Sequence, residues 1–245
     1  MSVNEILRRF PEHYQLRPLS PEMRDGWLDW SLDFFTDGNV LQVPYVDMVV
    51  QPDVSEAFAE YSRVAGLRED HPGSFFAFMV WHIVQAMKAH PSFLLRQIDG
   101  EWFEVHNAPV VVPVAVGGAP RFREIAIDDV ALMSYEDFAA CYRETLERAR
   151  QGDRHQAMAP ELFYIGHVFG NLPSLQFSSL TLHYRREAIA GQTLFYFGKR
   201  YFQGERLHIP FAAKLHHATT DPFVFGALLE GVLGRFPGSR GTPDP

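Results

Sequence analysis

Apolar side chains recur at helical spacing in four segments of the chain. Residues 53–66 have apolar positions three or four apart and end at a glycine, as an amphipathic helix does. Residues 75–89 are apolar nearly all round and stop before a proline, which is typical of a buried helix. Residues 135–150 have one apolar and one charged side, and residues 223–235 are apolar again. The pattern therefore predicts four helices.

Between these helices, β-branched and apolar runs predict strands. Residues 43–50 and 109–116 are such runs. Asp99 and Gly100 separate two short extended stretches, and this dipeptide favours a two-residue hairpin. Three further extended stretches are expected at residues 174–185, 193–203 and 206–218.

The two ends of the chain show no clear period. The first forty residues include several aromatic side chains, and we expect an irregular arm there, with Trp27, Trp30, Phe34 and Phe35. Residues 236–245 are rich in proline and glycine, which predicts a flexible tail. Because no repeat and no long linker separates the remaining elements, we expect a single domain over residues 1–235, an α/β sandwich of helices and antiparallel strands.

Composition narrows the class of protein. Of 245 residues, 47% are hydrophobic and 21% charged, as in a soluble globular protein, and 21 phenylalanines suggest an interior or pocket built from rings. The net charge of -8 and the lack of a basic run argue against a nucleic-acid partner. A single cysteine, Cys141, cannot form an intramolecular disulfide. With no signal-peptide pattern and no run long enough for a membrane span, we expect a cytoplasmic protein with no membrane partner.

One short motif, LHHATTDP at residues 215–222, carries candidate chemistry. Side chains alternate along residues 206–217, so His217 shares a side with Leu215 and the other apolar residues. Partial burial favours the neutral imidazole, which a general base needs. A core or rim histidine satisfied by the backbone is the alternative. Adjacent strand residues point to opposite faces, which disfavours a metal site.

The residues after the histidine pair have simpler interpretations. Asp221 stands just before Pro222 and the last helix, so we interpret it as a helix N-cap. Thr219 and Thr220 can form local hydrogen bonds and are assigned no chemistry.

The same motif resembles the HHxxxDG signature of the chloramphenicol acetyltransferases and their larger CoA-dependent relatives. The likeness extends over about residues 27–235 and includes the helix, hairpin and strand at residues 74–114 and the two strands before His217. It implies a two-layer sandwich of the CoA-dependent acyltransferase type, with helices on one face of a mixed, largely antiparallel sheet.

The resemblance also implies an activity and an assembly. It implies a homotrimer with active sites between subunits, in which His217 deprotonates an acceptor hydroxyl that attacks an acyl-CoA thioester, with acetyl-CoA as the simplest co-substrate and no metal. It further implies that the His217 ring bonds its own backbone carbonyl and that Asp221 is a buried structural group paired with an arginine. Lys199 matches a lysine near the CoA phosphates, although it can equally be a solvated strand lysine.

Four positions depart from the family pattern. Gly170 stands where the family has a serine that stabilises the oxyanion, and leaves Asn171 as the nearest side-chain donor, unless these two residues form only a turn. Tyr196 replaces a threonine and projects toward the expected substrate pocket. Pro222 replaces the motif glycine. Arg24 is the nearest candidate for the arginine that pairs with the aspartate, because residues 27–62 contain neither lysine nor arginine.

Three functions stay open at this point. The first is acyl transfer from CoA to a hydroxyl or amine of a small, fairly apolar acceptor. The second is a repurposed relative in a biosynthetic pathway that catalyses cyclisation, hydrolysis or condensation from a carrier-protein thioester without CoA. The third is a trimer that only binds a small molecule, which the aromatic content alone favours.

Overall fold

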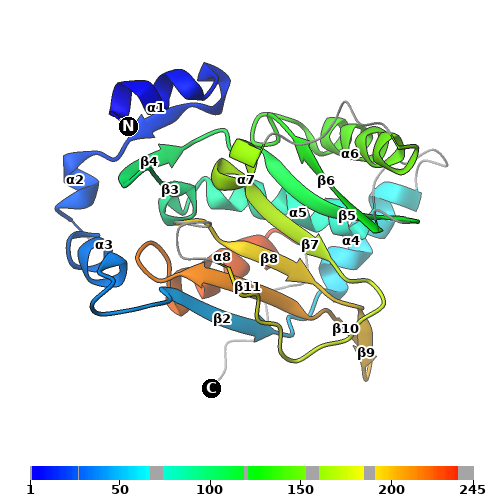
Figure 1. The fold of residues 1–245 in the computed structure, drawn as a ribbon. Coiled ribbons are helices and arrows are strands. Elements are labelled where there is room, and N and C mark those ends of the chain that lie inside the picture. Colours follow the sequence, from blue (N-terminus) through cyan, green and yellow to red (C-terminus); the bar gives the residue numbers. More distant parts are fainter. Residues whose placement is uncertain are drawn as a thin grey trace.

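A six-stranded sheet forms the centre of the molecule (Figure 1). The computed structural model describes residues 2–26, 28–66, 74–118, 121–152, 160–184 and 191–236. The strands lie in the order β2 (Tyr45–Val50), β11 (Phe211–His216), β8 (Leu194–Phe197), β7 (His167–Asn171), β5 (Val110–Gly117) and β6 (Arg121–Ile127). Only β7 runs parallel to its neighbours in this sheet, so the predicted mixed, largely antiparallel sheet is confirmed.

Four helices cover one face of this sheet, behind it in Figure 1. They are α4 (Ser55–Gly66), α5 (Phe75–Met87), α6 (Tyr135–Arg150) and α8 (Pro222–Leu233), close to the four segments predicted from apolar spacing. Phenylalanine rings fill the space between the two layers. Phe197 and Phe211 stack with centroids 4.5 Å apart, and Phe169 stacks on Phe195 at 5.3 Å. The core is therefore built from rings, as the composition suggested.

The N-terminal arm is ordered, which corrects our expectation. It contains α1 (Val3–Arg9), the short 3-10 helix η1 (Glu12–Tyr14), β1 (Leu16–Pro18), α2 (Pro21–Arg24) and α3 (Asp29–Thr36). Local caps explain why these short helices form: Ser2 and Glu5 make a capping box, and Ser20 caps α2 ahead of a proline. Trp27, expected in this arm, lies outside the described residues.

A small second sheet joins the arm to the body. Its order is β1, β4 (Glu101–Val105) and β3 (Leu95–Ile98), and the 3-10 helix η2 (Pro91–Leu94) precedes it. The predicted hairpin is confirmed, because Asp99 and Gly100 both have positive φ, as this turn requires.

Arg96 connects this hairpin to the large sheet through hydrogen bonds. Its guanidinium is fully buried and donates to the carbonyls of Phe93 (2.9 Å), Leu95 (2.7 Å) and Gly166 (3.1 Å). Gly166 follows helix α7 (Pro160–Ile165), so the cation caps a helix end that carries partial negative charge. Burial lowers the pKa of Arg96 to about 9.

Several predicted extended stretches differ in the structure. Residues 193–203 divide into β8 and β9 (Tyr201–Gln203), and residues 206–218 divide into β10 (Arg206–His208) and β11. Pro210 separates the last two strands because it lacks an N–H donor. The stretch expected at 174–185 forms no strand over its described residues, 174–184. The pattern gave no signal for β6, β7 and α7.

The C-terminal boundary also moves by one residue. Phe236, which we expected to open the flexible tail, is only 3% exposed and packs on Phe78 and His82. Residues 237–245 of the expected tail lie outside the described residues.

Candidate active site

His217 stands in the turn that follows β11. Its backbone N–H donates to the Pro44 carbonyl at 2.8 Å, and its half-buried ring stacks on Phe35 of α3, with centroids 4.0 Å apart. Its Nδ1 is buried and has no hydrogen-bond partner in the described structure. The bond to its own carbonyl that the resemblance implied is therefore replaced here by stacking on Phe35.

The alternation predicted along residues 206–217 is confirmed as far as His216. Leu207, Ile209, Phe211, Ala213 and Leu215 all belong to the core between sheet and helices. The opposite face carries buried Lys214, which pairs with Asp47 at 2.9 Å. Beyond His216 the chain turns, so His217 leaves the core and contacts the N-terminal arm instead.

Asp221 is the N-cap of α8. Its Oδ1 accepts hydrogen bonds from the N–H groups of Phe223 (2.7 Å) and Val224 (2.9 Å). Pro222 occupies the first turn of that helix, where its fixed φ is favourable, so the motif glycine is not needed for this backbone. Arg24 pairs with Asp33 at 3.6 Å, so our candidate partner for Asp221 was wrong. No ion pair to Asp221 exists among the residues described.

Asn171 and Lys199 line one cavity of about 390 Å³. Its lining combines apolar side chains with two cations, Lys199 and Arg200; the apolar members include Phe75, Phe76, Met79 and Phe197. The Arg200 guanidinium lies over the rings of Phe58 and Phe75, 4.5 and 4.8 Å from their centroids. A second cavity of about 300 Å³ shares Ser74, Asn171 and Pro173 with the first and adds Arg143 and Arg150. This combination fits an elongated ligand with an apolar stem and anionic groups.

The residues of this cavity and His217 lie at opposite ends of the sheet. Asn171 and Phe211 are both paired with Phe197, so they lie level with each other across the strands. His217 follows Phe211 by six residues, which at strand spacing is about 20 Å. The structure therefore brings Asn171 and Lys199 together and separates both from His217 and Asp221.

Gly170 and Tyr196 are neighbours on β7 and β8. A Cβ on Gly170 would lie 2.1 Å from Cδ1 of Tyr196, so the ring occupies the place of a side chain at residue 170. The alternative of a turn at Gly170 and Asn171 is wrong, because both residues belong to β7. Burial, with a smaller effect of the neighbouring Tyr184, raises the pKa of Tyr196 above its ordinary value.

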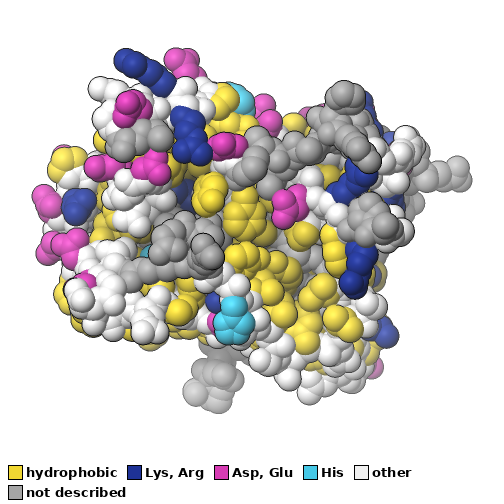
Figure 2. All heavy atoms as spheres, in the orientation of Figure 1, with side chains coloured by type: hydrophobic (Ala, Val, Ile, Leu, Met, Phe, Trp, Pro, Cys, Tyr) yellow, Lys and Arg dark blue, Asp and Glu magenta, His cyan; other side chains and the backbone are white. Residues whose placement is uncertain are grey.

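Apolar side chains also gather on the sheet face that the helices leave open, over β7 and β8 in Figure 2. Near His217, aromatic residues of α3 continue to the surface. Trp30 is 62% exposed and stacks on Phe34, which contacts Phe35. These exposed rings are a candidate contact for a partner or a ligand.

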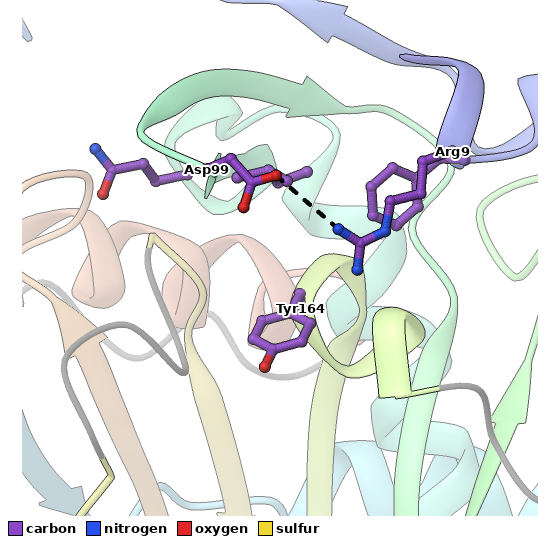
Figure 3. A pocket seen from close by; sticks show the side chains of 6 residues that line it. Arg9, Asp99 and Tyr164 are labelled. Carbon is purple, nitrogen blue, oxygen red and sulfur yellow. Dashed lines mark ion pairs between the residues drawn. The ribbon is translucent and has the colours of Figure 1, made fainter. Parts of the chain in front are cut away.

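A third, smaller cavity of about 200 Å³ lies between α1, the β3–β4 turn and α7 (Figure 3). Arg9 points into it and pairs with Asp99 at 4.0 Å and Glu161 at 3.5 Å, beside Tyr164. Arg9 is therefore already paired with two carboxylates. Among the described residues no cluster of histidine, cysteine or acidic side chains could hold a metal. None of the helices that the structure describes has the length and hydropathy of a membrane span.

Comparison with known proteins agrees with this fold. The chain is 28% identical to the chloramphenicol acetyltransferase of Escherichia coli over 160 residues, 63% of this chain and 69% of the relative. A solved chloramphenicol acetyltransferase superposes with a TM-score of 0.72 at 19% identity, covering 89% of this chain and 97% of that one. The dihydrolipoamide acetyltransferase of Azotobacter vinelandii superposes with a TM-score of 0.62 at 16% identity, covering 89% of each chain.

No protein-family profile matches the chain. The fold is that of the chloramphenicol acetyltransferases and of the acyltransferase cores of 2-oxoacid dehydrogenase complexes. The curated relatives carry the name chloramphenicol acetyltransferase, which supports an enzyme of the acyltransferase type. In sequence and fold together, the chain is similar to the chloramphenicol acetyltransferases and diverges from them.

Proposed function

We propose that this protein transfers an acyl group, acetyl in the simplest case, from CoA to a hydroxyl or amine of a small, fairly apolar acceptor. The observation that carries the proposal is the pair of half-sites at opposite ends of the sheet. One holds a half-buried histidine with an unpartnered ring nitrogen, and the other is a cavity lined by apolar side chains and by the cations Lys199 and Arg200.

In this proposal His217 is the general base. Its imidazole takes the proton from the acceptor hydroxyl while the oxygen attacks the thioester carbonyl. The tetrahedral intermediate then collapses, the C–S bond breaks, and the leaving thiolate receives the proton from the imidazolium. The ring has one face on Phe35, which restricts its rotation.

The second half-site serves the donor. Phe75, Phe76 and Met79 offer an apolar wall for the pantetheine arm, and Lys199 and Arg200 offer positive charge to the phosphates. The side-chain amide of Asn171, on the wall of the same cavity, donates a hydrogen bond to the oxyanion in place of the family serine. Tyr196 packs with the apolar residues of the open sheet face, next to Gly170, and we assign this pair to the acceptor side of the working site, outside the donor cavity.

Because the half-sites are about 20 Å apart in one chain, the working site combines His217 of one subunit with Asn171 of another. Apolar side chains at the His217 end, Trp30 among them, are then covered by the partner. We propose a homotrimer, as in the resemblance. Asp221 acts through its N-cap and has no part in proton transfer.

The test is the melting temperature of the purified protein with and without millimolar CoA. A ligand that binds only the native state raises the melting temperature. At a ligand concentration one hundred times the dissociation constant, the free energy of unfolding increases by about 2.7 kcal/mol. We expect an upward shift of several degrees, which Lys199→Ala reduces. Arg148→Ala, which removes an exposed cation paired with Glu144 on α6, is the control and should keep the shift.

Absence of any shift with CoA or acetyl-CoA would contradict the CoA-dependent reaction. It would favour the second function, a repurposed enzyme without CoA, for which the changed pair of Gly170 and Tyr196 is the specific observation. If CoA binds, thiol release over a panel of hydroxyl and amine acceptors then identifies the acceptor class.

A further inference from the structure

The turn that carries His217 is held by an unusual number of hydrogen bonds. Four donors lie within reach of the His216 carbonyl oxygen: the N–H groups of Thr219 (3.0 Å) and Thr220 (2.9 Å) and both threonine hydroxyls (3.2 Å each). A carbonyl oxygen has only two lone pairs, and the two shorter N–H bonds already use them. The hydroxyl protons are therefore available to other acceptors.

For Thr219 a second acceptor is present. Its Oγ1 lies 3.1 Å from the carbonyl of Gly191, three residues before β8. Gly191 packs closely against the β3–β4 hairpin: its φ is +84°, and an added Cβ would approach Trp102 to 2.7 Å and the Leu95 carbonyl to 2.9 Å. Thr219 thus links the histidine turn to a closely packed point beside that hairpin.

Helix α3 holds the same turn from another side. The Ser31 hydroxyl donates to the Ala218 carbonyl at 2.9 Å. Four residues later on the same helix, Phe35 stacks on the His217 ring. Because residues four apart lie on one helix face, α3 contacts both the backbone and the ring of this turn.

We propose that Thr219 and Ser31 are positioning residues for His217. The His217 ring has no hydrogen bond at Nδ1, so its place depends on Phe35 and on the backbone from which it projects. Thr219 and Ser31 fix that backbone on the C-terminal side, and the bond from His217 N–H to Pro44 fixes it at the histidine. The inference rests on the proposed role of His217 as base.

The experiment compares Thr219→Val and Ser31→Ala with Thr219→Ser, which keeps the hydroxyl. Thr220→Val is the matched control, because its hydroxyl reaches only the already occupied His216 carbonyl. Two quantities are measured: the imidazole resonances of His217, assigned by their loss in His217→Gln, and the steady-state constants for acyl transfer. The resonances can be measured even if the protein has no acyl-transfer activity.

We expect Thr219→Val and Ser31→Ala to shift or broaden the His217 resonances and to lower kcat about ten- to a hundredfold, with KM nearly unchanged. Thr219→Ser should restore both readouts, and Thr220→Val should change neither. Unchanged resonances and unchanged kcat in Thr219→Val and Ser31→Ala would overturn the inference.

The two proposals fail differently. If the resonances respond as expected while the wild-type protein transfers no acyl group, the positioning inference stands and the proposed function is wrong. If Thr219→Val does not fold, Ser31→Ala still decides the question, because it removes a half-buried hydroxyl without adding bulk.

Discussion

At the residue scale, Gly170 and Tyr196 form one packing unit. The tyrosine ring lies where the Cβ of any larger residue at position 170 would have to be. Restoring the family serine at this position therefore forces the ring to move or the strands to separate. Overpacking of this kind typically costs about 1–3 kcal/mol.

We predict that Gly170→Ser lowers the free energy of unfolding by that amount and that adding Tyr196→Thr recovers much of the loss. Urea unfolding of both single variants and the double variant measures this coupling, which should exceed about 1 kcal/mol. Additive losses would show that the two residues are independent.

Some of the site could be predicted residue by residue, and some could not. Strand alternation placed Leu215 in the core and put His216 on the other face, because a period of two is a local property. The contact of Gly170 with Tyr196 depends on the register between two strands that are 26 residues apart in the chain. The Arg24 pairing failed for the same reason, since nothing local decides which carboxylate an exposed arginine meets.

At the element scale, α5 carries a buried histidine whose charge state affects stability. His82 packs against Phe78 and Phe236, and burial, with a smaller effect of Arg235, lowers its pKa from 6.5 to about 4. Between about pH 4 and pH 6.5, His82 is therefore protonated in the unfolded chain and neutral in the folded chain. The stability that neutral His82 contributes is complete above about pH 6.5 and is lost as the pH falls toward 4.

We predict that His82→Phe flattens this part of the pH dependence. Between pH 7.5 and pH 4.5 the denaturant midpoint of the wild type should fall more steeply than the midpoint of the variant. The exposed His13, changed to glutamine, serves as the control and should leave the wild-type slope intact. Parallel curves for His82→Phe and the wild type would assign the acid sensitivity to other groups, fully buried His167 first among them.

Long elements were predicted well and short ones poorly. The apolar period of the four long helices extends over several turns, so it can be recognised even where single positions deviate from it. The short helices α1 and α2 depend on single capping serines, which hydrophobic spacing does not register. Residues 174–184 have apolar positions suited to a strand, but no strand pairs with them in the described structure, and an unpaired run is not a strand.

At the scale of the whole molecule, the separation of the two half-sites predicts how chains cooperate in the assembly. If each working site combines His217 of one chain with Asn171 of another, two differently inactivated chains can complement each other. In a trimer that contains both, one site unites an intact histidine with an intact asparagine.

We predict that His217→Ala and Asn171→Ala chains, each nearly inactive alone, regain part of the acyl-transfer activity when co-expressed with different tags and purified for both. Two His217→Ala chains with different tags control for the effect of co-expression. Mixed assemblies without recovered activity would place both side chains in a site within one chain, or remove Asn171 from it.

The close packing of Gly170 against Tyr196 also limits the route by which such a pair can arise. A chain with a serine at position 170 has no room for the tyrosine ring, whereas a chain with glycine there and a small residue at position 196 has only an unfilled space. The order with glycine first and tyrosine second therefore avoids the overpacked intermediate. A return path avoids it only in the opposite order, so a single reversal at position 170 carries the cost of overpacking as long as the tyrosine remains.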